Sequence, residues 1–227
     1  MIKSNRTQMT QIKLINADRS ARFRVIILAH FLLLAFIITG CGKNYTPEQK
    51  SYIDGIEKYR SAKNLEMKND PYSPFNKKTK VQFHDLKYFD PDPEFVFTSK
   101  LTEYNPKEEI TVYGTKGEPR SAVRYGYLNF VYKNQSIKLN VYKSSSGAGG
   151  IYYSIWFTDK TTNNETYGVG RYLEFEKSDD PENIYKIDFN LAFNPYCAYS
   201  PDYSCAIPTK EDFIPIEIRA GEKKFHD

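Results

Sequence analysis

Two runs of alternating apolar and polar residues, joined by a short polar segment, constrain the fold of this chain most. In Tyr125–Tyr132 the alternating residues are Leu128, Phe130 and Tyr132, and in Ser136–Lys143 they are Ile137, Leu139 and Val141. Successive side chains of a β-strand point to opposite faces, so a period of two predicts strands rather than helices. Residues Lys133–Gln135 supply a polar turn, and the whole segment is therefore predicted to form a β-hairpin.

The same period recurs along the rest of the chain without helical segments in between. The 19 tyrosines and 15 phenylalanines also favour sheets, because large rings pack across neighbouring strands. This pattern predicts a mainly β, antiparallel domain, barrel-like or a sandwich, over residues 71–227. The further strands are expected at Val81–Tyr88, Phe95–Phe97, Ile110–Val112, Ile151–Phe157, Val169–Glu176, Ile184–Asn190 and Phe213–Arg219.

One helix is expected ahead of this domain, within residues 41–70. Thr46 suits the N-cap, Pro47 the first helical position, and Gln49 stands three residues after the cap. The helix is predicted to run to about Leu65 and to dock one face on the β domain. That face is marked by apolar and aromatic residues at helical spacing, namely Tyr52, Ile53, Ile56 and Tyr59.

Residues 1–40 have the organisation of a secretory signal peptide. Three arginines precede a nearly unbroken apolar run, Val25–Ile38, which is shorter than the roughly 20 residues that span a bilayer. A retained transmembrane helix is the alternative. The run ends in Ile38–Cys41, which resembles the lipobox of bacterial lipoproteins. The resemblance implies cleavage before Cys41 and acylation of this cysteine, with palmitate among the acyl chains.

Loss of the leader changes the charge of the chain. The 32 basic and 28 acidic side chains fall to 26 and 27, and the formal net charge falls from +4 to −1. A balanced charge of this kind does not predict binding to nucleic acid. The expected location is the bacterial cell envelope, where lipid at Cys41 holds the protein to a membrane and the domain faces the periplasm or the cell exterior.

The sequence after the leader contains none of the common catalytic or metal-binding motifs. It has no G-x-S-x-G, H-E-x-x-H or C-x-x-C, and His84 is predicted to be a half-exposed strand residue. Gly168–Leu173 begins like a dinucleotide-binding loop, but a predicted strand follows it instead of a helix. Ser144–Gly150 lacks the lysine of a P-loop. Both segments are expected to be turns, and no cofactor or metal is expected.

Aromatic residues of one predicted strand allow two interpretations. Tyr152, Tyr153 and Trp156 could stack on a carbohydrate or another flat ligand. Rings on one face of a strand more commonly fill the core, and this second interpretation is favoured.

The segment Glu165–Lys223 carries the most specific pattern. Its blocks closely resemble the bacterial family catalogued as domain of unknown function 1684, and the similarity continues upstream through Val81–Phe83 to the Asp90–Pro93 turn. The family implies no activity. The blocks are Thr166–Tyr172, Asp188–Asn190, Asn194–Tyr199, Tyr203–Cys205 and Arg219–Lys223.

The chain departs from the family pattern after the second cysteine. Ala206 and Thr209 stand where the family has prolines, and Asp212 stands where it has an asparagine. A ligand role for that amide is therefore not carried over to this chain.

Two interpretations of the same segment remain open. In the structural one, Cys197 and Cys205 form a disulfide that closes an irregular loop, and nearby asparagines hydrogen-bond its backbone. In the functional one, the segment forms the wall of a pocket, and its polar side chains converge on a small ligand. The ligand-binding candidates are Arg171, Asn190, Asn194, Tyr199 and Lys223.

The leading functional expectation is a non-enzymatic envelope module that binds a small molecule or a partner protein. The rival is a histidine-independent hydrolase or transferase in which Asp188 and Glu222 provide acid–base chemistry near Arg171. The third possibility is structural support without a ligand, which would leave no cavity beside the polar segment.

Overall fold

The computed structural model describes residues 43–77, 81–145 and 149–226. The chain divides into two compact units, Met1–Thr46 and Pro47–Asp227. The expected signal peptide and the expected lipidation site at Cys41 lie outside the described residues. Within the described ranges, no helix combines the length and the apolar character that crossing a membrane requires.

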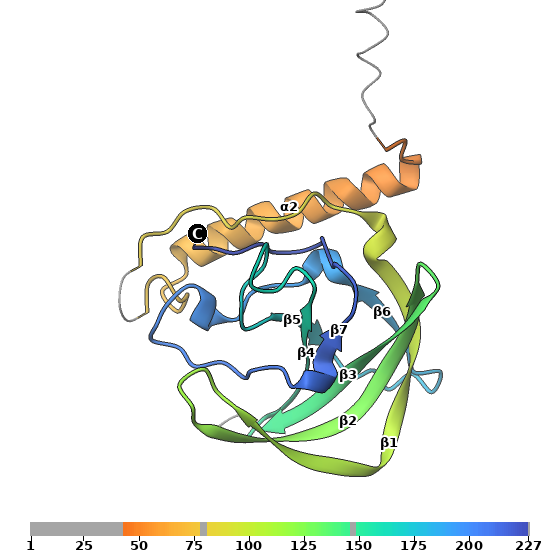
Figure 1. Cartoon of the computed structure of the whole chain (residues 1–227). Coiled ribbons are helices and arrows are strands. Elements are labelled where there is room, and N and C mark those ends of the chain that lie inside the picture. Colours follow the sequence, from red (N-terminus) through yellow and green to blue (C-terminus); the bar gives the residue numbers. More distant parts are fainter. Residues whose placement is uncertain (1–42, 78–80, 146–148, 227) are drawn as a thin grey trace, which may run out of the picture. The chain divides into compact units, whose positions relative to one another are not determined.

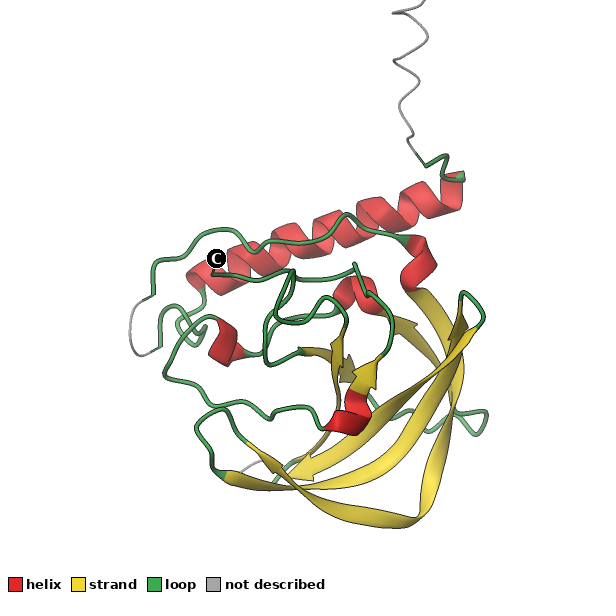
Figure 2. Cartoon of the chain, viewed as in Figure 1, coloured by secondary structure: helices red, strands yellow, loops and turns green. Residues whose placement is uncertain are grey.

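The described part of the Pro47–Asp227 unit is built on a curved half-barrel sheet of seven strands (Figures 1 and 2). The strand order is β5-β4-β3-β2-β1-β6, all neighbours are antiparallel, and β7 pairs with β4 in parallel. The predicted mainly β, antiparallel fold is confirmed. The strands are β1 (Val96–Tyr113), β2 (Pro119–Tyr132), β3 (Gln135–Ser145), β4 (Ile151–Asp159), β5 (Arg171–Phe175), β6 (Ile184–Asp188) and β7 (Phe213–Ile214).

The predicted hairpin is formed by β2 and β3. Tyr132 pairs with Gln135, so the turn has only two residues between the strands. Lys133 and Asn134 both have positive φ, 46° and 64°, as the type I′ turn of a tight hairpin requires. The turn is thus one residue shorter than the sequence suggested.

The long strand β1 unites two segments that were predicted as separate strands. The start of β1 pairs with β6, and its end pairs with β2. The register with β2 shifts between Glu103 and Glu108, which marks an irregularity of the β-bulge kind. Such irregularities bend a strand and increase its twist, and this one lets β1 follow the curvature of the half-barrel.

The concave face of the half-barrel holds the main core. Strand residues such as Val141 and Phe157 are fully buried there. The C-terminal segment covers this face, because Ile218 and Ala220 are also fully buried in the same cluster. Burial of this kind contributes about 25 cal/mol for each Å² of apolar surface, so the C-terminal segment is part of the core rather than a tail.

Helix α2 (Pro47–Asn69) lies across one end of the half-barrel (Figure 1). It ends four residues later than the predicted Leu65. Its buried side is the stripe Ile56, Arg60 and Met67, and Arg60 Nη1 donates to the carbonyl of Phe89 at 2.8 Å. Tyr59, predicted on the docked face, is 44% exposed.

The predicted strand Val81–Tyr88 is wrong, since the structure contains only an isolated bridge between Tyr88 and Glu222. The backbone of this segment has mixed partners. Leu86 N donates to Asn64 Oδ1 of α2 at 2.9 Å, and the carbonyl of Lys87 accepts from Lys223 N at 2.8 Å. The apolar residues of the segment pack in a second core cluster that includes Met67 of α2. Leu86 is buried there, and Val81, Phe83 and Tyr88 are partly buried beside it. His84 belongs to the same segment and is exposed. Its ring stacks on that of Phe225, with ring centres 3.8 Å apart.

The predicted last strand, Phe213–Arg219, shrinks to the two residues of β7. The reason is that the carbonyls of Ile218 and Ala220 accept hydrogen bonds from the guanidinium of Arg171. These carbonyls are therefore not free to continue a ladder. Three short 3-10 turns lie in the C-terminal third, at Phe189–Leu191, Tyr196–Ala198 and Lys210–Asp212, and most of the residues around them form loops.

Candidate functional site

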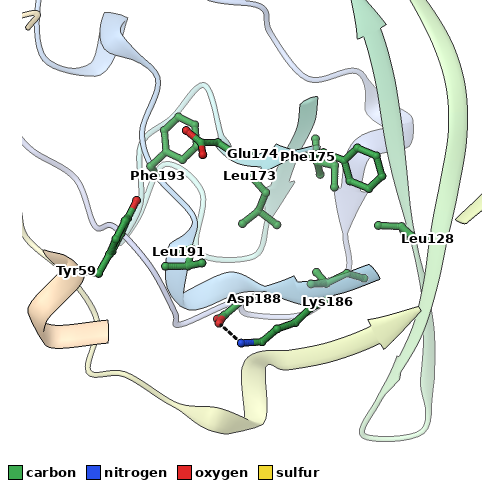
Figure 3. Close-up of a pocket in the computed structure, with 11 residues that line it drawn as sticks. Tyr59, Leu128, Leu173, Glu174, Phe175, Lys186, Asp188, Leu191 and Phe193 are labelled. Carbon is green, nitrogen blue, oxygen red and sulfur yellow. Dashed lines mark ion pairs between the residues drawn. The ribbon is translucent and has the colours of Figure 1, made fainter. Parts of the chain in front are cut away.

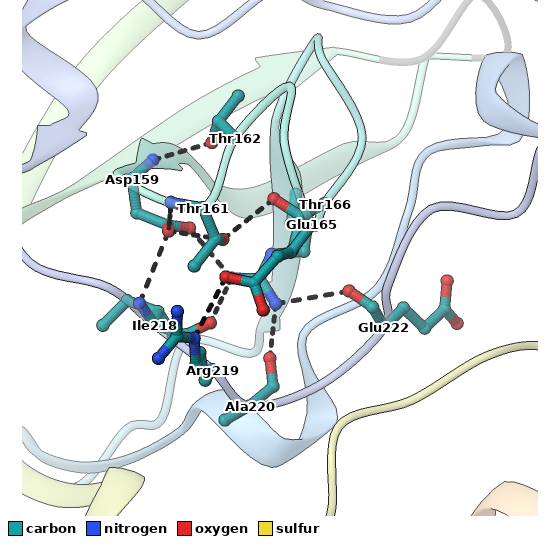
Figure 4. A network of polar contacts seen from close by, with 10 residues as sticks. Asp159, Thr161, Thr162, Glu165, Thr166, Ile218, Arg219, Ala220 and Glu222 are labelled. Carbon is teal, nitrogen blue, oxygen red and sulfur yellow. Dashed lines mark hydrogen bonds and ion pairs between the residues drawn. The ribbon is translucent and has the colours of Figure 1, made fainter. Parts of the chain in front are cut away.

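Arg171, the first residue of β5, is fully buried. Figure 4 labels the residues that bind its guanidinium, namely Asp159, Ile218, Ala220 and Glu222. Its Nη2 forms an ion pair with Asp159 Oδ2 at 2.8 Å and donates to the carbonyl of Ile218 at 2.7 Å. Its Nη1 donates to the carbonyls of Ala220 and Glu222. Burial lowers the pKa of Arg171, and the charge of Asp159 opposes this shift. The guanidinium thus fastens the C-terminal segment to the sheet.

Gly170 makes this placement of Arg171 possible. Its φ is +111°, a conformation that side chains disfavour, and a Cβ there would stand 2.5 Å from the carbonyl oxygen of Phe157. The predicted turn ahead of this glycine is confirmed. Its structural role is to direct the chain into β5 so that Arg171 enters the core.

Glu222 is the centre of a second buried cluster and is 1% exposed. Its Oε2 accepts hydrogen bonds from the hydroxyl of Tyr199 and from Asn194 N, the latter at 2.9 Å. Its Oε1 lies 3.2 Å from Lys63 Nζ of α2. Burial, together with the charge of Glu222, raises the pKa of Tyr199 well above its ordinary value.

Two further candidates from the sequence, Asn194 and Lys223, lie beside this second cluster. Asn194 Nδ2 donates to the carbonyl of Lys223 at 2.8 Å. The ammonium of Lys223 lies 4.8 Å from the centre of the Phe89 ring. Arg171, Asn194, Tyr199, Glu222 and Lys223 are therefore brought together, and they bind one another and the backbone rather than facing an open cavity.

Asp188 and Asn190 belong to a third cluster, at the end of β6. The hydroxyl of Tyr52 on α2 lies 2.8 and 2.9 Å from the two oxygens of Asp188. Asn190 Nδ2 donates to the Tyr52 hydroxyl at 2.9 Å and to the carbonyl of Asp92 at 2.8 Å. These contacts fix α2 to the sheet.

The two catalytic candidates thus lie in different hydrogen-bond clusters. Asp188 bonds to Tyr52 and Asn190, whereas Glu222 bonds to Tyr199 and Asn194. The carboxylate that does pair with Arg171 is Asp159, which sequence analysis did not single out. The only sequence signal for it was indirect, since a buried arginine needs a buried carboxylate.

The two cysteines face each other as free thiols. Cys197 N lies 3.2 Å from Cys205 Sγ, and the side chains interact. A hydrogen bond from Cys205 lowers the pKa of Cys197 to about 7. The structure thus brings the predicted pair together without joining it, and the disulfide stays a prediction.

Asp212, the departure from the family pattern, has a structural role. It is 3% exposed and accepts hydrogen bonds from Asn140 Nδ2 at 2.9 Å and from the Tyr142 hydroxyl at 2.7 Å. It links the 3-10 turn Lys210–Asp212 to strand β3.

The aromatic residues of β4 divide between core and surface. Trp156 is 3% exposed and stacks on Tyr142 with ring centres 4.4 Å apart, and Tyr153 packs against the main core. Tyr152 is 47% exposed. Trp156 and Tyr153 thus belong to the core, as the favoured interpretation expects. Together with Tyr152 they also line a cavity of about 310 Å³, so ligand stacking stays a prediction.

A cavity of about 220 Å³ opens where the half-barrel is not closed (Figure 3). The sheet ends at β5 on one side and at β6 on the other, and no ladder joins these two strands within the described residues. Both strands line the cavity, which reaches the core residues Leu128 and Ile155, 1% and 2% exposed. Its apolar floor continues through Leu173, Phe175 and Ile187.

The rim of the cavity is polar and aromatic. Lys186 and Asp188 of β6 form an ion pair of 3.3 Å on one side (Figure 3). Tyr59 of α2, Glu174 of β5 and Phe193 stand on the other side. An apolar interior with a few polar groups at its entrance is the usual composition of a small-molecule site.

Of the candidates from the sequence, only Asp188 lines this cavity. Sequence analysis missed the other residues that line the cavity, because each has an ordinary structural role in its own segment. Leu173 and Ile187 are strand residues of a core, and Tyr59 is a helix residue. The signal that defines the site is the sheet topology, since an open edge between β5 and β6 cannot be read from one segment. Among the described residues, no group of three or more His, Cys, Asp or Glu could hold a metal ion.

Comparisons with known proteins agree with this fold. The chain is similar to an uncharacterised protein of Haloarcula marismortui, whose solution NMR structure superposes with a TM-score of 0.58 at 24% identity. The match covers 79% of this chain and 98% of that chain. No curated protein matched.

The family comparison covers more than half of the chain. The model of the family described as protein of unknown function (DUF1684) matches residues 81–223, a range that includes every described strand. The predicted resemblance is confirmed, and the chain belongs to the DUF1684 family.

Proposed function

We propose that the protein is a lipid-anchored module of the bacterial cell envelope that binds a small, largely apolar molecule in the cavity between β5 and β6. The anchor is supported by the apolar leader and by the lipobox-like sequence that ends at Cys41. The binding role rests on one observation, namely that the open side of the half-barrel leads to an apolar cavity floored by Leu128 and Ile155.

Close packing makes an open apolar space in a domain core informative. Protein interiors contain few voids larger than a water molecule, because each void forfeits contacts between its walls. Here larger side chains on β5 or β6 could have filled the space, yet the wall residues Leu173 and Ile187 leave it open. A site that binds a ligand gives this space an occupant.

The volume sets the size of the ligand. A dry apolar cavity of about 150 Å³ binds benzene, whereas sites for drug-sized ligands have roughly 300–1,000 Å³. The cavity of about 220 Å³ lies between these values. It suits one ring, or a short aliphatic chain, with a polar substituent that remains at the rim.

The proposal is tested by titrating the Pro47–Asp227 unit with 2-phenylethanol and recording amide shifts by NMR. This unit contains every residue that lines the cavity. The match to the H. marismortui protein, whose structure was solved in solution, covers 98% of that chain. We expect saturable shifts at β5, β6 and Leu191. No saturable shift up to the solubility limit of the ligand would contradict the proposal.

A matched pair of variants ties the binding to the cavity. Leu191 lies at the rim and is 36% exposed, so Leu191→Trp places an indole at the entrance. We expect its affinity to fall at least about tenfold, or 1.4 kcal/mol. Val131→Trp is the control, because Val131 is 65% exposed on β2 and does not line the cavity. Equal effects of the two variants would place the binding elsewhere.

A further inference from the structure

We infer that the ligand of this cavity is a cation, with an apolar group in the cavity and an ammonium at the rim beside Glu174, Tyr59 and Phe193. The inference rests on the proposed function and names the ligand class for the same site. It follows from the charges and rings of the rim.

The three residues stand where two cavities meet. A second cavity, of about 390 Å³, lies along α2 and is lined by Lys63 and Glu66. Tyr59, Glu174 and Phe193 line both this cavity and the one between β5 and β6. A ligand that fills the apolar cavity can therefore place its polar end beside these three side chains.

The lysines of the rim already have anionic partners. Lys186 Nζ lies 3.3 Å from Asp188 Oδ2, and Lys63 Nζ lies 3.2 Å from Glu222 Oε1. Asp188 and Glu222 are 5% and 1% exposed. Because buried carboxylates need a compensating charge, these two lysines are committed to the protein and are poorly suited to bind an anionic ligand.

The carboxylates that remain have no such partner. Among the described residues, no ion pair or hydrogen bond engages the side chain of Glu174 or of Glu66, and both are exposed. The uncompensated charge of the residues that line the two cavities is therefore negative. A negative charge beside a low-dielectric wall attracts cations more strongly than the same charge on an open surface.

The rings supply a second attraction for the same kind of ligand. Phe193 already has a cation–π contact, because Lys63 Nζ lies 4.6 Å from the centre of its ring, so Tyr59 is the ring that remains for the ligand. Tyr59 is half-exposed, and its ring has no aromatic or cation–π contact within the described residues. An ammonium at the rim would meet the face of Tyr59 and the carboxylate of Glu174 together.

Three ligands with the same ring and chain length separate charge from shape. These are 2-phenylethylamine, which is cationic at pH 7, neutral 2-phenylethanol and anionic phenylacetate. We expect the amine to bind the Pro47–Asp227 unit about five- to thirtyfold more tightly than the alcohol, or about 1–2 kcal/mol. Phenylacetate is expected to bind more weakly than the alcohol. The preference for the amine should shrink between 0.01 and 1 M salt, roughly, as screening increases.

Replacing one carboxylate by an amide of nearly the same shape tests which carboxylate binds the ammonium. In Glu174→Gln the amine is expected to lose most of its advantage, while the affinity for the alcohol stays unchanged because the apolar cavity is intact. Glu176→Gln is the matched control, since Glu176 is also exposed, follows β5 directly and lines neither cavity. That variant is expected to retain the preference for the amine.

The outcomes distinguish this inference from the proposed function. If the amine and the alcohol bind equally, or phenylacetate binds best, the ligand class is wrong while the binding function stands. If the preference survives in Glu174→Gln but disappears in Glu176→Gln, the assigned carboxylate is wrong. If none of the three ligands binds, the proposed function fails and the inference fails with it.

Discussion

Arg171 and Asp159 form an ion pair of 2.8 Å in which the side chains are 0% and 1% exposed. The pair lies where the end of β4 and the start of β5 meet the C-terminal segment. The Nη atoms of Arg171 also donate to the carbonyls of Ile218 and Ala220 in that segment. One buried charge therefore joins the ends of two consecutive strands to the C-terminal segment, whose Ala220 lies 49 residues after Arg171.

Removal of this arginine should be strongly destabilising. Arg171→Met keeps the bulk of the side chain but leaves Asp159 buried without its counter-charge, and breaking such a pair costs about 3–5 kcal/mol. Urea unfolding measures this loss. Arg219→Met is the control, because Arg219 pairs with Glu165 at the surface and is half-exposed. Similar losses in both variants would contradict the role assigned to Arg171.

The buried tyrosines predict a loss of stability at alkaline pH. Burial, with the neighbouring Glu222, raises the pKa of Tyr199 well above 10, so Tyr199 stays protonated in the folded chain while it ionises in the unfolded one. Its contribution is complete below about pH 10 and declines as the pH rises further. In Tyr199→Phe the slope of stability against pH above 10 should decrease by up to about 1.36 kcal/mol per pH unit.

Urea unfolding between about pH 9 and 12 measures this slope. The variant should also be less stable at pH 7, by about 1–3 kcal/mol, because Glu222 loses a buried donor. A slope identical to that of the wild type would show that Tyr199 ionises without cost in the folded state.

The cysteine pair predicts selective thiol chemistry. Because Cys205 donates a hydrogen bond that lowers the pKa of Cys197 to about 7, Cys197 should react with iodoacetamide first, with a midpoint near pH 7. In Cys205→Ser the pH midpoint of Cys197 labelling should move away from about 7, because the hydrogen bond from the Cys205 thiol is lost. Peptide mass spectrometry after brief labelling identifies the modified residue. Faster labelling of Cys205 would contradict this assignment.

The same two thiols should close to a disulfide with oxidised glutathione. The reaction removes two hydrogen atoms from the protein and reduces one glutathione disulfide to two thiols. A disulfide that closes the short loop between Cys197 and Cys205 would stabilise the fold by about 2–3 kcal/mol. Intact mass with and without reductant detects the bond, and urea unfolding measures the gain. A mixed disulfide with glutathione as the final product would contradict closure.

The lipid anchor makes a prediction about Cys41. Labelling of the producing bacteria with radioactive palmitate should mark the full chain, and Cys41→Ser should abolish the label and release the protein from the membrane fraction. Cys197→Ser should keep the label. Label that persists without Cys41 would show that the leader has another function.

The strands of the sheet could be predicted where alternation and turn chemistry agree. The β2–β3 hairpin combines a period of two with a polar turn, and both signals point to one structure. Alternation alone misled at Val81–Tyr88, because that segment packs Leu86 against α2 without joining a ladder. It misled again at Phe213–Arg219, where Arg171 takes the carbonyls that a strand would need.

The candidate site was harder to predict for a physical reason. Sequence analysis selects charged and polar residues, and here those residues, Arg171 and Glu222 above all, are buried in contacts with other parts of the protein. The cavity is lined instead by Leu128, Ile155 and Leu173, which have the pattern of any core. It exists because the half-barrel stays open between β5 and β6, a property of the whole sheet.

The central claim is that a ligand enters this opening and reaches the core. The most direct test is the measurement of intermolecular NOEs between the ring protons of bound 2-phenylethanol and the methyl groups of the Pro47–Asp227 unit. We predict contacts to Leu128, Ile155 and Leu173, which form the floor of the cavity. Contacts confined to exposed residues such as Tyr152, with none to these three side chains, would contradict the claim.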